Sequence, residues 1–242
     1  MAIKQLKETL AAEYPCRIEL HAHTTPASKC SEITPQLMVE TYKKLGFDAL
    51  VLTNHFFLHE DMPKAEYIDF YMDDFHRTRE IGERLGLKVY LGTEIRFTEN
   101  GNDFLIFGVE RNMLEEIYDL LPYGVAHFRQ HYKMPDSVFV QAHPMRSSKG
   151  SQPVEPELLD GVEVFNTHPF HEGRIGLAAL YAQENKIEII TAGSDFHHPN
   201  LNHEGLSAMR TTRLPEDSFD LAAMLKEKNY LLEVGRGVII LP

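Results

Sequence analysis

The chain has 242 residues, 43% of them hydrophobic, which suits one domain spanning residues 1–242 with a sizeable core. Its net charge of -12 argues against a stable nucleic-acid partner, because proteins that bind phosphate backbones present a basic face. It contains no apolar run of about 18 residues that would predict a membrane span. A charged N-terminus and two cysteines without a disulfide pattern predict a cytoplasmic protein.

Apolar runs of strand length alternate along the chain with helical stretches. The predicted strands lie near residues 17–23, 48–55, 88–97, 104–109, 138–143, 161–166, 187–195 and 230–234. The predicted helices lie near residues 34–45, 64–85, 113–121, 127–132, 174–184 and 217–228. Thr34-Pro35 is typical of a helix start, and Gly46 and Gly86 are typical of helix ends. Asn-Gly within residues 99–102 predicts a hairpin between the third and fourth strands. The alternation favours a parallel α/β barrel over an open sheet.

Residues that bind metals gather where the predicted strands end. His21 and His23 close the first strand and point the same way, with Cα atoms about 6.5–7 Å apart. Two imidazoles at that separation can bind one ion, although an isolated pair is more typical of hydrogen-bonded histidines inside a barrel. The further strand-end candidates are His55, Glu94, His143, Asp195 and His197. The C-terminal strand ends of a parallel barrel meet on one face, so these side chains are expected to converge. Mixed histidine and carboxylate ligands suit Zn, Mn or Fe.

The motifs HAHT, LTNH, GTE, QAHP, EVFN and GSDFH occur in this order within about residues 17–214. In this order they resemble the PHP (polymerase and histidinol phosphatase) family. The resemblance implies a distorted (β/α)7 TIM-like barrel with two or three divalent metal ions and the hydrolysis of phosphate esters. It assigns the ligands of the first ion as His21, His23, Glu94 and Asp195, those of the second as Glu94 and His143, and those of the third as His55 and His197.

Two positions depart from the family pattern. Where the family often has an acid or a histidine after the H-x-H motif, this chain has Lys29 and Cys30. A Cys30 thiolate can bind a metal, whereas the charge of Lys29 repels one. Where many members open the fourth strand with a histidine ligand, this chain has Asp103, which is either an oxygen ligand of the second ion or a turn acid.

Arginines and histidines beside these motifs are the candidates for substrate contacts. Arg146 and Arg96 are predicted to bind phosphate, because a guanidinium meets two phosphate oxygens at once. His197 and His168 are predicted to protonate the leaving alcohol, since histidine titrates near neutral pH. His198 and His203 follow the last motif as further candidates for substrate contact.

The sequence therefore predicts a metal-dependent phosphoesterase that hydrolyses a small phosphate mono- or diester by metal-activated hydroxide. Histidinol phosphate, a nucleotide and a sugar phosphate remain open as substrates, and the oligomeric state is unassigned. The alternatives are an amidohydrolase-type deaminase or amidase, and a catalytically degenerate metal-binding domain.

Overall fold

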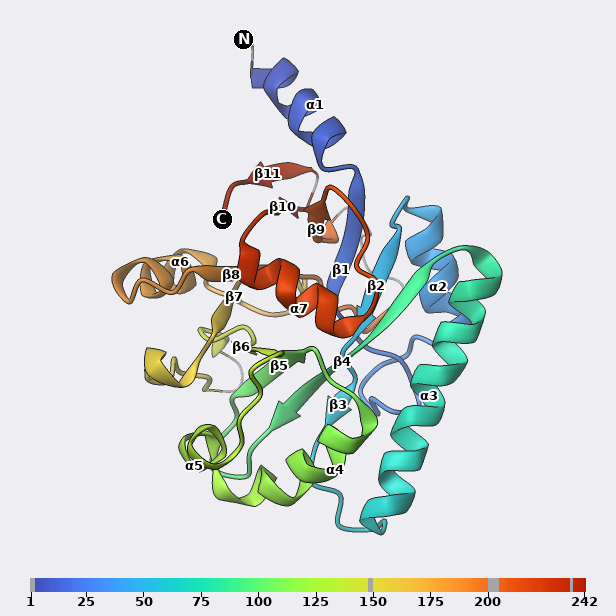
Figure 1. Cartoon of the computed structure of the whole chain (residues 1–242), viewed down its shortest axis with the longest axis vertical. Helices are drawn as coiled ribbons and strands as arrows, with labels where there is room; N and C mark the ends of the chain where they lie inside the picture. Colours follow the sequence, from blue (N-terminus) through green and yellow to red (C-terminus); the bar gives the residue numbers. More distant parts are fainter. Residues whose placement is uncertain (1–2, 148–149, 200–204, 236) are drawn as a thin grey trace.

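A computed structural model describes residues 3–147, 150–199, 205–235 and 237–242 (Figure 1). The helices are α1 (Ile3–Glu13), α2 (Pro35–Lys44), α3 (Lys64–Leu85), α4 (Arg111–Leu120), α5 (Val125–His131), α6 (Ile175–Glu184) and α7 (Ser218–Glu227), with the short 3-10 turns η1 (Leu121–Tyr123) and η3 (Pro156–Leu158). The strands are β1 (Cys16–Ala22), β2 (Ala49–Leu52), β3 (His55–Phe56), β4 (Lys88–Arg96), β5 (Asp103–Phe107), β6 (Val138–Gln141), β7 (Gly161–Asn166), β8 (Ile189–Gly193), β9 (Ala208–Thr211), β10 (Leu231–Val234) and β11 (Val238–Ile240). Within this described part, no helix has both the length and the apolar character that a membrane crossing requires.

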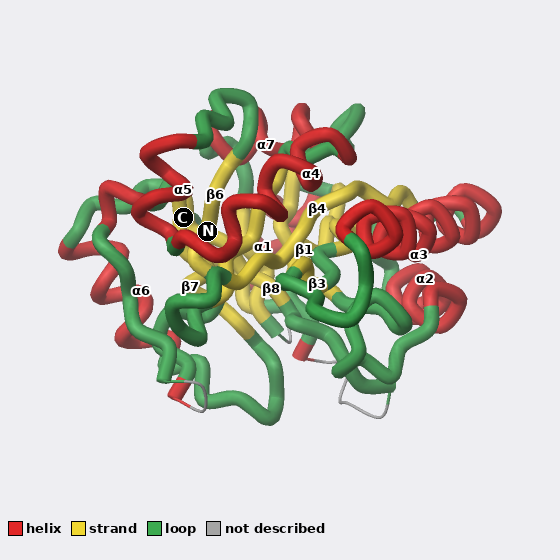
Figure 2. Tube along the Cα trace, turned by 90° about the horizontal axis from the view of Figure 1, so that it is seen from below, coloured by secondary structure: helices red, strands yellow, loops and turns green. Residues whose placement is uncertain are grey.

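The described strands form a curled, mixed sheet with helices packed around it (Figure 2). The strand order is β11-β10-β9-β1-β2-β4-β5-β6-β7-β8, and β3 pairs with β4 beside this path. The curl brings the end of β8 next to β1, where Ala22 and Phe196 form a parallel bridge. The His23 amide donates a hydrogen bond to the Phe196 carbonyl at 3.2 Å. Strand ends far apart in the sequence are thereby brought to one place.

The prediction of a parallel (β/α)7 barrel holds only in part, because the sheet is mixed and a complete barrel of that kind is not seen. β5 runs antiparallel to both β4 and β6, and β9, β10 and β11 add further antiparallel pairs. The direction of β5 follows from the predicted hairpin between β4 and β5. The pairing of Arg96 with Asp103 confirms that hairpin. A tight turn reverses the chain direction, whereas a parallel neighbour needs a long crossover.

The helix ends agree with the sequence signals. The Thr34 side chain accepts a hydrogen bond from the Leu37 amide and caps α2, whose first residue is Pro35. Gly46 and Gly86 follow α2 and α3 with φ of 74° each, a conformation that glycine adopts readily. Helix α1 and strands β9 and β11 were not predicted; α1 has no buried residue among those described and projects from the body (Figure 1).

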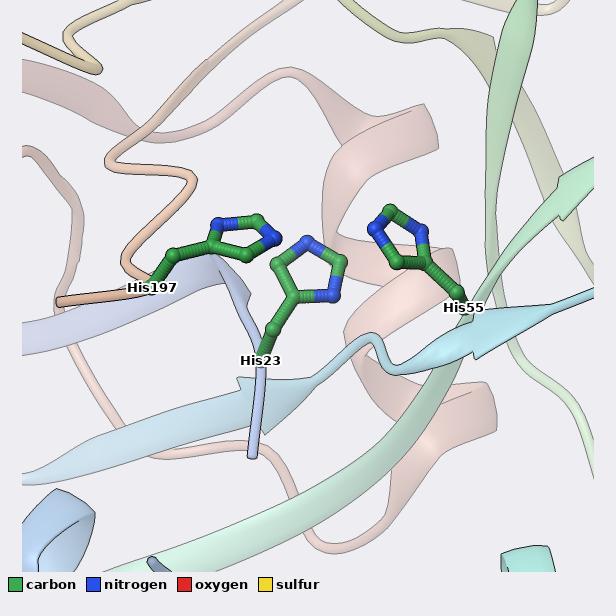
Figure 3. A group of neighbouring side chains, drawn as sticks. All are labelled: His23, His55 and His197. Atoms are coloured by element: carbon green, nitrogen blue, oxygen red, sulfur yellow. The ribbon is translucent and has the colours of Figure 1, made fainter. Parts of the chain in front are cut away.

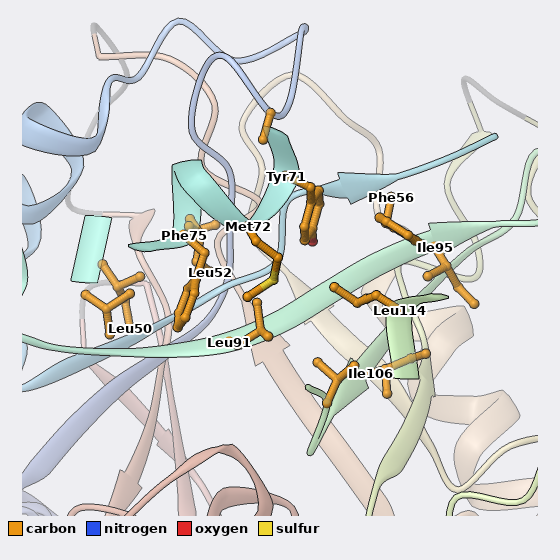
Figure 4. Packing of buried hydrophobic residues seen from close by; sticks show 14 of the residues in the cluster. Leu50, Leu52, Phe56, Tyr71, Met72, Phe75, Leu91, Ile95, Ile106 and Leu114 are labelled. Atoms are coloured by element: carbon orange, nitrogen blue, oxygen red, sulfur yellow. The ribbon is translucent and has the colours of Figure 1, made fainter. Parts of the chain in front are cut away.

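The core beneath the site is built by α3 against β2, β4 and β5. Tyr71, Met72 and Phe75 of α3 face the apolar side chains of the sheet (Figure 4). The Tyr71 hydroxyl also donates to the Asn54 carbonyl at 2.8 Å and lies 3.0 Å from the Thr93 hydroxyl, which can donate to it. The same helix that fills the core therefore holds the segments that precede His55 and Glu94.

Candidate metal centre

Glu94 lies at the middle of the cluster of predicted ligands. It is completely buried in β4, and histidine nitrogens approach its carboxylate from several strands. Its oxygens lie 3.4 Å from His21 Nε2, 3.6 Å from His23 Nε2, 2.6 Å from His55 Nδ1 and 3.1 Å from His143 Nε2. A carboxylate surrounded in this way can bridge two cations.

Asp195 closes the other side of the cluster. Its Oδ1 lies 3.6 Å from His21 Nε2, 3.4 Å from His23 Nε2 and 3.2 Å from His197 Nδ1. Asp195 follows β8 with φ of 50°, an uncommon backbone conformation for a non-glycine residue. The junction of β8 with β1 thus places an acid from the end of the sequence against histidines from its beginning.

His23, His55 and His197 form a group at the outer side of the centre. Figure 3 shows the His23 ring between the other two, with centroids 4.4 Å from His55 and 4.2 Å from His197. One nitrogen from each of the three lies within 4.8 Å of the others, a spacing that permits a shared ion. His23, predicted as a ligand of the first ion, belongs to two groups of candidate ligands: one with His21 and Asp195, and one with His55 and His197.

Lys29 and Cys30, the departures from the family pattern, point to different places. The Lys29 amino group lies 3.3 Å from His59 Nε2, in an exposed contact. Cys30 is an exposed residue, and its thiol lies near His55 and His197. Burial tends to raise the pKa of this thiol, but the neighbouring His197 and His55 outweigh it and lower the pKa to about 6. Cys30 therefore lies beside the predicted third-site ligands His55 and His197, and Lys29 contacts His59.

The charges of the cluster favour the ionised carboxylates. Burial alone raises the pKa of Glu94 and of Asp195, but the neighbouring histidines outweigh it and hold both pKa values well below their ordinary range. Burial, followed by the charges of His197 and His55, holds the pKa of His23 well below its ordinary value. Burial lowers the pKa of His21, His55 and His197, but the nearby carboxylates outweigh it and raise these pKa values, to about 9 for His55 and about 10 for His197. Because cations bind ionised carboxylates and neutral imidazoles, an ion that binds here displaces protons from these rings.

The donor atoms fit divalent ions because they converge on one place without forming a complete set of hydrogen bonds among themselves. The buried atoms His21 Nε2, His23 Nε2, His55 Nδ1, Glu94 Oε2 and Asp195 Oδ2 make no hydrogen bond of good geometry among the described residues, although His55 Nδ1 and Glu94 Oε2 lie only 2.6 Å apart. Buried polar atoms without good hydrogen bonds are costly, so a cluster of them needs an explanation. Nitrogen and carboxylate ligands in such groups suit Zn, Mn or Fe.

A family match adds to this geometry. The PHP domain family model matches residues 19–195, most of the chain. The chain belongs to the PHP domain family.

The chain is similar to proteins of several kinds. Over 125 residues it is 26% identical to the DNA polymerase III PolC-type of Oceanobacillus iheyensis, a match that covers 46% of the chain and 8% of that polymerase. A two-domain protein of Bacteroides vulgatus, containing a predicted PHP-like metal-dependent phosphoesterase, matches with a TM-score of 0.64 and 16% identity over 91% of this chain and 65% of its own. PsfC from Pseudomonas syringae matches with a TM-score of 0.59 and 15% identity over 94% and 91% of the two chains. At these identities the structural likeness shows the fold alone.

Asp103 and Arg96, two further predicted site residues of this PHP domain, are engaged with each other. The Arg96 guanidinium donates to both Asp103 oxygens, at 2.6 and 2.8 Å, and lies 4.5 Å from the centroid of the Phe57 ring. Asp103 Oδ2 remains 3.8 Å from His143 Nε2. The pair therefore borders the second site. It stays a prediction that Asp103 binds a metal ion and that Arg96 contacts phosphate.

Arg146 and His168 lie at the opposite border of the centre. Arg146 is buried, its Nη1 lies 3.8 Å from Asp195 Oδ2, and its Nη2 donates to His171 Nε2. The His168 ring stacks on His171 at 3.9 Å and lies 5.7 Å from the His197 ring. Both predicted substrate residues therefore reach the metal centre, whereas His203 lies outside the described residues.

The protonation state of His168 can be tested directly. Burial lowers its pKa to about 3, so the ring is protonated only in strong acid and stays neutral around pH 7. We expect the ring proton signals of His168 in the metal-free protein to show no NMR titration between about pH 5 and pH 8. His168→Asn identifies the signals by their loss. A midpoint near the ordinary histidine pKa of about 6.5 would contradict this result.

Sequence reasoning missed the buried acids that support the ligands. Glu19 accepts hydrogen bonds from the amides of His21 at 2.9 Å and Ser194 at 3.0 Å, and from the Tyr42 hydroxyl at 2.9 Å. Glu163 contacts the His21 ring. The available signal was an acid inside an apolar strand, and Glu19 is also on the same face as His21 because side chains alternate along a strand. Burying a carboxylate is costly unless it accepts hydrogen bonds, so an acid inside an apolar strand indicates that donors surround it.

Proposed function

We propose that this PHP domain is a metal-dependent phosphoesterase that hydrolyses a small phosphate mono- or diester. The observation that carries the proposal is the convergence of buried histidine and carboxylate atoms around Glu94 and Asp195, without a complete set of hydrogen bonds among them. A structural metal site needs one closed ligand shell, whereas this cluster offers overlapping groups that share His21 and His23. Overlapping groups are typical of sites that hold several ions for hydrolysis.

The residues divide between two or three divalent ions. His21, His23, Glu94 and Asp195 would hold the first ion, and Glu94 with His143 the second. His55 and His197, with the Cys30 thiol beside them, would hold the third. When bound, such ions supply Lewis acidity and acidify a water molecule so that it becomes a nucleophile near neutral pH.

The protein supplies the charge that orients the ester. Arg146 lies within 3.8 Å of Asp195 and is buried, so its guanidinium can hold phosphoryl oxygens in a site from which water is largely excluded. Its position orients the phosphate toward the ligand cluster. His197 and His168 were the predicted candidates for protonating the leaving oxygen, but a His168 ring that is neutral near pH 7 is a poor acid. His197 is therefore the candidate for this role, and loss of the alkaline limb of the pH–rate profile in His197→Ala would support it.

The deciding experiment measures phosphate release after the metal is removed with a chelator and Mn²⁺, Zn²⁺ or Fe²⁺ is restored. The panel holds histidinol phosphate, nucleoside monophosphates, sugar phosphates and an aryl phosphate, and diesters are followed by loss of substrate. We expect turnover only with restored metal, and none in His21→Ala because that variant loses a ligand of the first ion.

The control for folding is the circular dichroism spectrum and unfolding midpoint of metal-free His21→Ala beside wild type. Ion binding without turnover on any ester would refute the phosphoesterase proposal and favour the amidohydrolase or the degenerate binding domain. Turnover that persists in the chelated protein would refute the metal dependence.

A further inference from the structure

Glu163 lies directly behind the metal centre and touches ligands of two proposed ions. It is completely buried in β7. Its Oε1 accepts a hydrogen bond from His21 Nδ1 at 2.8 Å. Its Oε2 accepts from the His143 amide at 3.0 Å and from Asn166 Nδ2 at 2.9 Å. One carboxylate therefore orients the ring of a first-ion ligand and the backbone of a second-ion ligand.

The contact with His21 determines which nitrogen faces the metal. A proton on Nδ1 that is donated to Glu163 leaves Nε2 to act as the ligand atom. That Nε2 is the atom 3.4 Å from Glu94 and 3.6 Å from Asp195. A carboxylate on the far nitrogen also makes an imidazole a stronger metal ligand.

The contact with His143 holds an unusual backbone conformation. His143 follows β6 with φ of 29°, where few residues other than glycine are found. Such a conformation is strained and persists only where neighbours enforce it. The amide hydrogen bond to Glu163 fixes this turn, from which His143 Nε2 reaches Glu94 at 3.1 Å.

The two oxygens of Glu163 accept hydrogen bonds from three donors, so the position requires a carboxylate rather than an amide side chain. An ionised carboxylate has only acceptor sites, whereas a glutamine offers one oxygen and turns an NH₂ group toward one of the donors. The surroundings leave little freedom to adjust, since even a methyl group at Gly193 would overlap the Glu163 carboxylate and the His21 Cβ.

We propose that Glu163 is a positioning residue for both ions, through His21 for the first and His143 for the second. The inference rests on the metal centre of the proposed function but not on its substrate. Glu163 itself need not touch a metal or a substrate. Its loss should therefore weaken metal binding while every proposed ligand remains in the chain.

The test measures the affinity of chelator-treated wild type and Glu163→Gln for Zn²⁺ and Mn²⁺ by calorimetry. We expect Glu163→Gln to bind each ion about 10- to 100-fold more weakly, the usual effect of losing such an outer partner. In the Zn²⁺-loaded wild type, the His21 Nδ1 proton should give a downfield NMR signal, assigned by its absence from His21→Ala. That signal should be shifted or lost in Glu163→Gln.

Glu233→Gln is the matched control, since Glu233 is a buried carboxylate that accepts hydrogen bonds from Arg17 and Arg210 near the start of β1. It should lose stability without losing metal affinity. Unchanged affinity in Glu163→Gln, or an equal loss in Glu233→Gln, would overturn the positioning role. If wild type binds ions but hydrolyses no ester, the phosphoesterase proposal fails while the comparison of the two variants still decides the role of Glu163.

Discussion

Glu94→Gln is expected to remove at least one bound ion and to lower kcat/KM by on the order of a thousandfold, as loss of a major charge-stabilising group does. The reason is the central place of Glu94, whose two oxygens are approached by His21, His23, His55 and His143. Glutamine keeps the size of the side chain but replaces one of these oxygens with an NH₂ group. It also removes the negative charge that the surrounding histidines stabilise.

The measurement is metal content after dialysis, together with phosphate release on the best ester of the panel. Glu94→Asp is the comparison, because it keeps the charge and shortens the reach by one methylene, so part of the metal should be retained. A Glu94→Gln protein that holds as much metal as wild type and works within tenfold of its rate would show that Glu94 does not bridge the ions.

The ligand types and their positions at strand ends could be read from the sequence because both depend on local patterns. An alternating strand fixes the shared face of His21 and His23, and an apolar run shows where the strand ends. The hairpin before Asp103 was also predicted, from Asn-Gly. Such a hairpin makes β5 antiparallel to β4, which is incompatible with the wholly parallel sheet that the alternation of strands and helices favoured.

Contacts between distant segments could not be predicted in the same way. Whether Asp103 faces a metal or Arg96 depends on side-chain geometry across the hairpin, and the sequence left both readings open. Glu163 is 142 residues from His21, and no local pattern links the two. The placement of Cys30 beside His55 and His197 likewise depends on how the loop after β1 folds back.

Gly193→Ala is expected to destabilise the metal-free protein by about 1–3 kcal/mol and to weaken metal binding, although residue 193 is not itself a ligand. Gly193 ends β8, and an added Cβ would overlap the Glu163 carboxylate and the Cβ of His21. The His21 Cβ is anchored to its backbone and cannot swing aside. The strain must therefore displace β8, β1 or the carboxylate that orients His21, and each displacement moves the first-ion ligands.

Urea unfolding of the metal-free protein measures the first effect, and calorimetry with Zn²⁺ measures the second. Gly176→Ala provides the contrast, because a Cβ at Gly176 in α6 meets nothing within 4 Å. That change should stabilise the helix by about 0.5–1 kcal/mol and leave metal affinity unchanged. If Gly193→Ala has the same free energy of unfolding and the same affinity for Zn²⁺ as wild type, the close packing of β8 against Glu163 and His21 does not constrain the metal centre. If both properties fall together, the space behind the ligands is as much a part of the site as the ligands themselves.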